Sequence, residues 1–229
     1  MGTDISTDVQ AQLKARQQRL AAKLEGLSEG GEPNAIKAQG QHFILPDGET
    51  KIPMPLKVVV LGFAYFNAYY KSKYVQGQAS FPDCFAVGDH IPSMQPSQNS
   101  PDAQHENCLT CPHNQFGSAE NGRGKACGNR MNLAVQLPEF GGAEGPIYRI
   151  SVSPTALTGW KQLVDKLSSR GVDPIQLVIE IGRDPNVDYM KYTFSAVSKV
   201  DPDELGAYLN NADEAERMIM SEPKPPSDE

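Results

Sequence analysis

Four cysteines are the residues of this chain with the clearest metal chemistry: Cys84, Cys108, Cys111 and Cys127. Because only two residues separate Cys108 from Cys111, their thiolates can bind one metal ion from a single tight turn. Cys84 and Cys127 can complete a tetrahedral set with no open position, which is what a structural zinc ion requires. We therefore predict one structural zinc ion, held by all four cysteines, that fastens a loop to a larger domain.

Other uses of the four cysteines are less favoured. A disulfide framework is typical of short secreted chains, and the polar N-terminus lacks the apolar core of a signal peptide. An iron–sulfur cluster also takes four thiolates and stays open as the second cofactor hypothesis. His90, His105 and His113 could each replace a cysteine as a ligand, although solvated loop side chains are the simpler interpretation.

Aromatic and basic residues on both sides of the cysteine segment indicate a ligand. Half of the eight tyrosines lie between residues 65 and 74, interleaved with lysines. Aromatic faces stack on the bases of a single nucleic-acid strand and cations contact its phosphates, with little sequence preference. A second basic set surrounds Cys127, where Gly122 and Gly124 let the backbone approach a phosphate. The residues predicted to bind nucleic acid are Tyr65, Phe66, Tyr69, Tyr70, Lys71, Lys73, Tyr74, Arg123, Lys125 and Arg130.

Each of these residues also has a purely structural interpretation. The first rings, from Phe63 to Phe66, could fill the core of the body, which we favour for Phe63. Core packing and surface stacking explain the later tyrosines equally well, and the second basic set could be a solvated loop.

The net charge of −7 is confined to the C-terminal end of the chain. Residues 201–229 contain nine acidic residues and only Arg217 and Lys224, so residues 1–200 are neutral overall. A neutral body leaves its basic clusters free to meet a polyanion, and an acidic tail can compete with that polyanion. A solubilising role explains the tail equally well.

The sequence does not favour a membrane protein or an enzyme. No apolar run approaches the roughly 20 residues needed to cross a bilayer, so we expect a cytoplasmic protein. Residues 117–123 have the glycine spacing of a phosphate loop without its Lys-Ser/Thr ending. Cys108 and Cys111 lack the His-x-Glu motif that accompanies the cysteine pair of zinc deaminases.

Hydrophobic periodicity predicts a strand-rich body with a helix at each end. An amphipathic helix is expected over residues 8–27, a second from Ser153 to Gly171 and a third from Asp201. Gly62 is expected to form a bulge or a bend. Strands are expected at residues 42–45, 57–66, 131–137, 147–152, 175–181 and 187–200.

This order predicts three segments and a fold class. Residues 1–40 hold the N-terminal helix and a linker, residues 41–200 the body with its zinc-binding insertion at about 78–130, and residues 201–229 a helix and an acidic, disordered tail. Several strands, one helix and two more strands match the five-stranded, partly open barrel of the OB-fold. We therefore expect a mostly β, α+β protein with an OB-fold-like barrel.

On these residues the chain resembles the zinc-containing OB-fold proteins with which phages coat single-stranded DNA, the T-even helix-destabilising proteins being the familiar type. The shared plan is a four-ligand metal subdomain in a strand-rich body, aromatic and lysine residues beside it, and an acidic C-terminal tail. The segment from Pro82-Asp83-Cys84-Phe85 to Gly124-Lys125-Ala126-Cys127 also looks like a family of phage and prophage proteins.

The resemblance implies a non-enzymatic single-stranded-DNA-binding protein of phage DNA replication or recombination, acting in the host cytoplasm. Replication or recombination proteins would be partners of the acidic tail. Two features depart from the familiar type: four cysteines replace a ligand set that includes a histidine, and the chain ends in Ser-Asp-Glu without a terminal aromatic residue. Two alternatives stay open, a zinc-stapled adaptor between proteins and an iron–sulfur nuclease-associated protein.

Overall fold

The computed structural model describes Arg16 and residues 34–72 and 80–225. The chain divides into two units, residues 1–33 and 34–229, and the strands and helices discussed below all belong to the second. The helix predicted over residues 8–27 lies outside the described residues, apart from Arg16.

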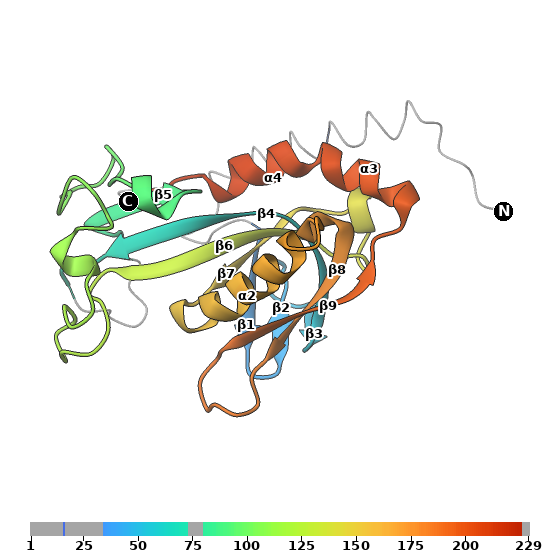
Figure 1. Ribbon diagram of the computed structural model, residues 1–229, viewed down its shortest axis with the longest axis horizontal. Coiled ribbons are helices and arrows are strands. Elements are labelled where there is room, and N and C mark those ends of the chain that lie inside the picture. Colours follow the sequence, from blue (N-terminus) through green and yellow to red (C-terminus); the bar gives the residue numbers. More distant parts are fainter. Residues whose placement is uncertain (1–15, 17–33, 73–79, 226–229) are drawn as a thin grey trace. The chain divides into compact units, whose positions relative to one another are not determined.

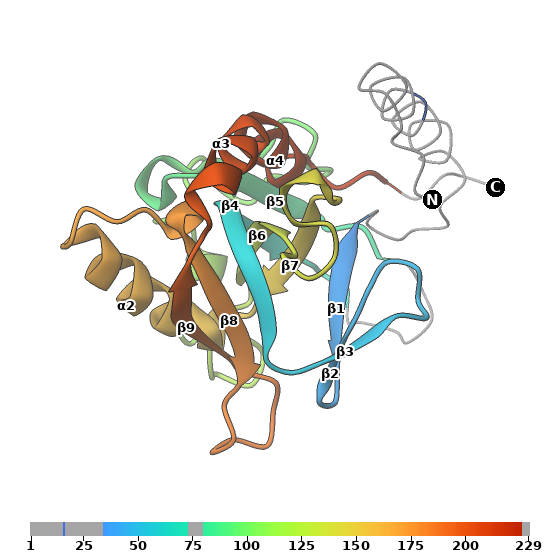
Figure 2. The same cartoon turned by 90° about the vertical axis from the view of Figure 1, so that its right-hand side faces the viewer.

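A curled β-sheet forms half a barrel at the centre of the second unit (Figures 1 and 2). Its strands follow the order β3-β2-β1-β7-β6-β4-β8-β9, and β5 also pairs with β4. Neighbouring strands are antiparallel except for the parallel pair β1 and β7. The strands are β1 (Ala35–Gln39), β2 (His42–Ile44), β3 (Lys51–Pro53), β4 (Leu56–Tyr69), β5 (Cys84–Gly88), β6 (Gly128–Gln136), β7 (Tyr148–Val152), β8 (Leu177–Arg183) and β9 (Tyr192–Lys199).

Few helices accompany the sheet, which confirms the expectation that the protein is strand-rich and also contains helices. They are α2 (Leu157–Ser168), α3 (Pro202–Asn210) and α4 (Ala212–Ile219). Short 3-10 turns lie at η1 (Ile91–Ser93), η2 (Pro112–Asn114), η3 (Gly142–Glu144), η4 (Pro154–Ala156) and η5 (Pro174–Gln176). Asp201 caps α3 as expected, because its carboxylate accepts a hydrogen bond from the Asp203 amide at 3.0 Å.

Strand β4 organises the sheet because it is long and buried on both faces. It pairs with β6 along one edge, while β8 and then β5 share the other edge. The run of β-branched valines from Val58 to Val60 suits an extended, buried backbone. The register with β6 shifts between Val60 and Gly62, which confirms the bulge expected at Gly62 and leaves Leu61 as the extra residue.

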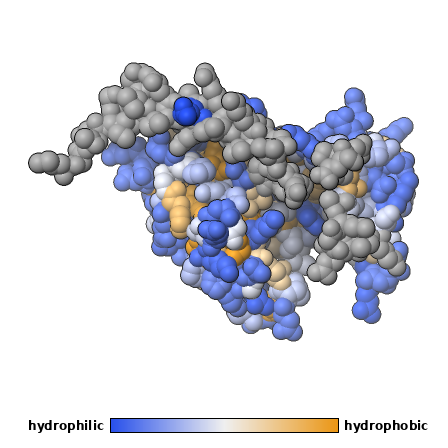
Figure 3. Space-filling model, turned by 180° about the vertical axis from the view of Figure 1, so that it is seen from behind, coloured by the Kyte–Doolittle hydropathy of each residue, from blue (hydrophilic) through white to orange (hydrophobic). Residues whose placement is uncertain are grey.

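Each face of the sheet is covered by helices (Figure 1). On one face α2 contributes Trp160, whose ring meets Phe63 and Phe194 edge-on at centroid distances of 5.8 and 5.3 Å. On the other face α3 and α4 bury Tyr208 and Ile219. On the surface seen in Figure 3, hydrophilic residues surround smaller apolar areas.

The C-terminal segment forms two helices where one was predicted. Two helices, α3 and α4, pack on the sheet as far as Ile219. The buried amide of Gln136 helps to hold them, since its oxygen accepts a hydrogen bond from Asn211 at 3.1 Å and its nitrogen donates to the Ala143 carbonyl at 3.0 Å. Six of the nine acidic residues therefore lie at the N-cap of α3 or on the helices, not in a tail.

Three short strands were not predicted. Strand β1 lies in the expected linker, β3 follows the turn at Gly48, and β5 lies in the expected insertion. Strands of three to five residues are too short to show an alternation of apolar and polar residues. Their pairing depends on backbone hydrogen bonds to strands that are distant in sequence, as for β1 with β7.

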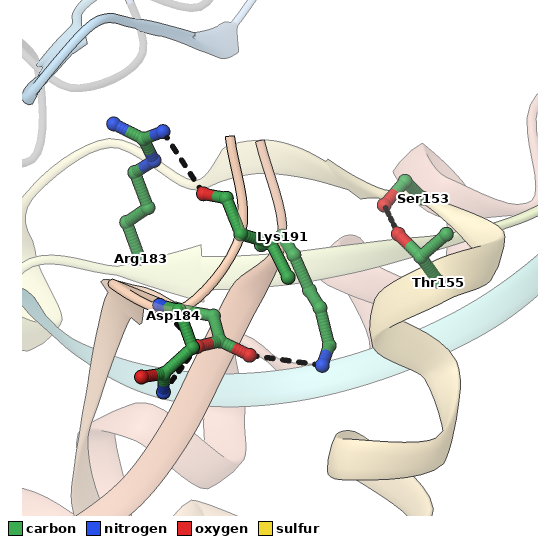
Figure 4. A network of polar contacts seen from close by, with 7 residues as sticks. Ser153, Thr155, Arg183, Asp184 and Lys191 are labelled. Atoms are coloured by element: carbon green, nitrogen blue, oxygen red, sulfur yellow. Dashed lines mark hydrogen bonds and ion pairs between the residues drawn. The ribbon is translucent and has the colours of Figure 1, made fainter. Parts of the chain in front are cut away.

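Polar side chains order the connection between β8 and β9 (Figure 4). Lys191 Nζ lies 2.9 Å from Asp184 Oδ2, and this hydrogen bond lowers the pKa of Asp184. Arg183 donates to the backbone carbonyls of Val187 and Asp188 at 3.2 and 3.1 Å. Figure 4 also shows the Ser153 and Thr155 hydroxyls, which lie 3.0 Å apart at the start of η4.

Tyr192 should make the protein sensitive to alkali. It is 7% exposed, and burial raises its pKa from 10.0 to about 12. Because the folded-state pKa is the higher one, the stabilisation is complete below pH 10.0 and is lost as the pH rises through about 12. We expect the free energy of unfolding of the wild type to fall by about 3 kcal/mol more in alkali than that of Tyr192→Phe, which has no hydroxyl to titrate.

Urea unfolding at neutral and alkaline pH measures this difference. Tyr189→Phe is the matched control, because Tyr189 follows β8 in the same hairpin and is 53% exposed. An equal alkaline loss in wild type and in Tyr192→Phe would contradict the assignment.

Within the part of the chain that the structure describes, no helix has both the length and the apolar character needed to cross a membrane.

Candidate nucleic-acid interface

Strands β5, β4 and β6 lie side by side at the end of the sheet where the loops drawn in green gather in Figure 1. Cys84 of β5 pairs with Tyr69 of β4, and Ala68 of β4 pairs with Gly128 of β6. Cys127 precedes Gly128 in the chain. Continuing the antiparallel register by one residue therefore places Cys127 opposite Tyr69, on the side of β6. Because paired residues share a face of the sheet, β4 brings Cys84 and Cys127 to the two sides of Tyr69.

The segment of residues 89–127 folds over this face. The His113 ring stacks on Tyr69 with 4.3 Å between ring centroids and 28° between the planes. Backbone hydrogen bonds run from the Cys127 amide to the His113 carbonyl at 2.8 Å and from the Cys108 amide to the Met94 carbonyl at 2.9 Å. The segment predicted to be an insertion is therefore held together by its own backbone hydrogen bonds and contacts the sheet at Tyr69.

All four cysteines are buried, free thiols, and together they line a cavity of about 20 Å³. A cavity of this size holds one water molecule at most. Burial raises the pKa of Cys127 to about 12. Burial, opposed by a hydrogen bond with Asn67, also raises the pKa of Cys108, with a further contribution from Cys84 and Cys111 nearby. The environment of Cys108 and Cys127 therefore favours the neutral thiol.

The predicted zinc site at Cys84, Cys108, Cys111 and Cys127 is wrong. Among residues 34–72 and 80–225, no group of three or more His, Cys, Asp or Glu side chains is arranged to hold a metal ion. The iron–sulfur alternative fails on the same observation. The cysteine spacing brings four sulfurs to one cavity, and there they pack as small apolar groups. His90 and His105 hydrogen-bond within their own turns, to Ser93 and to the Asn107 carbonyl.

Polar side chains, rather than a metal ion, account for the order of this segment. Asn114 is 7% exposed; its amide donates to the Cys108 carbonyl at 2.6 Å and accepts from Lys125 Nζ at 3.1 Å. The Ser118 hydroxyl donates to the His113 carbonyl at 2.8 Å and accepts from the Ala126 amide at 2.9 Å. These hydrogen bonds connect the part of the segment around Asn114 and Ser118 to the part around Lys125 and Ala126.

Removal of the Asn114 side chain should loosen the segment. Asn114→Ala leaves the buried Cys108 carbonyl without its donor, and we expect it to lower the free energy of unfolding by about 1–3 kcal/mol. Chemical denaturation measures this. Asn121→Ala is the control, because Asn121 is exposed and accepts only a local bond from the Arg123 amide at 2.9 Å. Equal effects of the two substitutions would show that Asn114 does not order the segment.

An exposed phenylalanine with a cation above it lies in this segment. Phe116 is 84% exposed, and Lys125 Nζ lies 5.4 Å from its ring centroid, within range of a cation–π interaction. A hydrogen bond of 2.7 Å from the Gly117 amide to the Gly124 carbonyl closes the intervening loop. Gly122 and Gly124 have φ of 67° and 80°, a conformation that favours glycine. We name Phe116, Arg123 and Lys125 the loop surface.

The aromatic residues predicted to bind nucleic acid do not form one surface. Side chains alternate along β4, so Tyr65 and Tyr69 lie on one face and Phe66 on the other. Tyr65 packs edge-on against Phe63, with 6.2 Å between ring centroids, which places it at the edge of the core. Tyr69 is half-buried beneath His113, and Tyr70 is 43% exposed.

The predicted basic residues are similarly divided. Lys71 forms an ion pair with Asp102, and their hydrogen bond raises the pKa of Lys71, so its charge is already partnered. Arg130 is exposed beside Phe66, on the face opposite Tyr69. Arg123 and Lys125 belong to the loop surface. Lys73 and Tyr74 lie outside the described residues.

Phe116 is the residue that sequence reasoning missed. It has no apolar neighbours at strand or helix spacing and lies between Gln115 and Gly117 in a polar, glycine-rich stretch. A large aromatic residue in such a context has no core to join, and this was the available signal of exposure.

A scan against protein-family models, a search of curated proteins and a search of solved structures each return no match to this chain. The resemblance to phage DNA-coating proteins therefore stays a hypothesis about function.

Proposed function

We propose that this protein binds single-stranded DNA without catalysing a reaction, in the replication or recombination of phage DNA. The observation that carries the proposal is the 84% exposure of Phe116 with the Lys125 ammonium 5.4 Å from its ring centroid. A base can stack on the free side of an exposed ring, and the lysine beside it can reach the adjoining phosphate.

The other residues of the loop surface support this assignment. Arg123 is exposed at the closed tip of the loop and makes no ion pair with any described residue. Its neighbours Gly122 and Gly124 carry no side chain, so a phosphate can approach the backbone. The proposed path of the strand runs from Phe116 past Arg123.

We also propose the OB-fold-like barrel as the finer architecture of the body. The curled half-barrel and the helix α2 between β7 and β8 are compatible with a partly open barrel. Loops at the end of such a barrel are a usual site for single-strand binding, and residues 89–127 lie at such an end. The acidic face of α3 and α4 would be the contact for basic partners in replication or recombination.

Binding of labelled oligothymidylate, followed by fluorescence anisotropy at increasing salt, tests the proposal. If Arg123 and Lys125 of the loop surface each contact one phosphate, the logarithm of the association constant should fall with log[salt] at a slope of about −1.4. Arg123→Ala should reduce the slope by about 0.7. Lys161→Ala should not change it, because Lys161 is an exposed lysine of α2 paired with Asp165. No binding at low salt would refute the proposal.

A further inference from the structure

A gap in the sheet opens where the edge of β4 changes partner. Pairing with β8 ends at Val59 and pairing with β5 begins at Tyr65. On this edge no described strand pairs with residues 60–64, and no described loop forms a backbone hydrogen bond with them. Val60 and Ala64 are nevertheless 2% and 1% exposed. Polar backbone groups at a buried strand edge need another partner, either water or a ligand.

The gap is the floor of a pocket of about 330 Å³, a volume at the lower end of the range for small-molecule sites. Val60, Leu61, Gly62 and Phe63 form the floor. The walls are Val164 and Ser168 of α2, Ile219 and Glu216 of α4, and Asp173 and Pro174 at the start of η5. The bulge at Leu61 and Gly62 belongs to this floor, and Ile219 packs over Gly62, where a Cβ would lie 3.6 Å from Ile219 Cδ1.

The charges on the pocket have one sign. Asp173 and Glu216 are exposed carboxylates among the lining residues, and no lysine or arginine is among them. The Asp173 carboxylate is fixed in place, since it accepts a hydrogen bond from the Ile175 amide at 3.0 Å. An acidic rim above an apolar floor favours a ligand that is cationic at one end and apolar at the other.

We propose that this pocket binds a small organic cation, an ammonium or guanidinium group attached to an apolar body. The apolar body would lie on Val60 and Phe63, and the cationic group would face Asp173 and Glu216. The unpaired edge of β4 would supply hydrogen-bond partners. This site lies apart from the loop surface and does not depend on nucleic-acid binding.

Trp160 makes occupancy of the pocket measurable. It is the single tryptophan of the chain, and it lies one helical turn before Val164 on the same face of α2. Its ring meets Phe63 of the pocket floor at a centroid distance of 5.8 Å. A ligand on Phe63 changes the surroundings of this indole, so tryptophan fluorescence reports binding in the full-length protein.

Titration with phenylbutylammonium, followed by tryptophan fluorescence, tests the proposal. We expect a saturable change, and a weaker or absent change with phenylbutyrate, which has the same apolar body and the opposite charge. Glu216→Gln should weaken phenylbutylammonium binding on the order of threefold. Glu214→Gln should leave it unchanged, because Glu214 is an exposed carboxylate of α4 that does not line the pocket.

Ser168→Trp tests the location of the site. Ser168 is exposed on α2, so a larger side chain there fills the pocket without entering the core. We expect this variant, with isothermal titration calorimetry as the readout, to lose binding while its melting temperature stays close to that of wild type. Absence of a saturable response in wild type, equal binding of phenylbutyrate, or unchanged binding in both Glu216→Gln and Ser168→Trp would overturn the proposal.

Discussion

Phe116→Ala is expected to bind oligothymidylate on the order of tenfold more weakly than wild type, because one stacked base contributes about 1–3 kcal/mol. The change should leave the melting temperature unaltered, since the Phe116 side chain is 84% exposed and contributes nothing to either core. Fluorescence anisotropy with a labelled oligonucleotide measures the affinity.

Two further substitutions make this result specific to stacking at Phe116. Phe116→Trp should retain or strengthen binding, because indole also presents a flat π face. Phe140→Ala is the matched control: Phe140 is 39% exposed and lies in the turn after β6, remote in sequence from the loop surface. Equal losses for Phe116→Ala and Phe140→Ala, or no loss for either, would contradict a role of Phe116 in stacking.

Truncation after Val200 is expected to abolish cooperative folding. It removes Tyr208, Ala215 and Ile219, which are 0%, 0% and 1% exposed, and uncovers Val59 and Ala134 on the sheet. Deleting one large buried side chain costs about 2–5 kcal/mol, and the whole domain is stable by only about 5–15 kcal/mol. Thermal unfolding followed by circular dichroism should show no transition, and a native-like transition would contradict the packing of α3 and α4.

A shorter truncation separates the acidic end from the fold. Removal of residues 222–229 spares both helices and removes three acidic residues and Lys224. Glu222 accepts hydrogen bonds from the Ser97 hydroxyl at 2.5 Å and from the Asn99 amide at 2.7 Å, so it lies against the segment that carries the loop surface. We expect this variant to fold and to bind oligothymidylate more tightly at low salt, because fewer negative charges lie near the phosphates. Weaker binding would contradict competition by the acidic end.

Much of the sheet could be predicted because most of its strands show a pattern of apolar and polar residues that is visible in the local sequence. The valine run of β4, the alternation in β9 and the cap residue before α3 depend on neighbours within a few positions. The bulge at Gly62 was also foreseeable, since glycine inside an apolar strand is typical of one. The short strands β1, β3 and β5 were not, because their partners are distant and their side chains carry too little periodicity.

In the candidate site, too, some features could be predicted from local sequence and others depended on contacts between distant residues. Cysteine spacing correctly indicated that four sulfurs converge, because Cys84 and Cys127 flank β4 and a turn carries the other two. The inference of a zinc ion failed, since the geometry of side chains in a folded segment is not contained in their spacing. In β4, the two-residue period placed Tyr65 and Phe66 on opposite faces, whereas composition alone had grouped them.

The strand-rich class, the position of β4 and the clustering of aromatic and basic residues around the cysteines follow from residue types at short range, so the amino-acid sequence was enough to predict them. Which of those residues are free to meet a ligand became known from the folded arrangement. Lys71 is neutralised by Asp102 and Tyr69 is covered by His113, while Phe116 and Arg123 stay exposed. Exposure and ion pairing depend on contacts between segments far apart in the chain, and no local pattern encodes them.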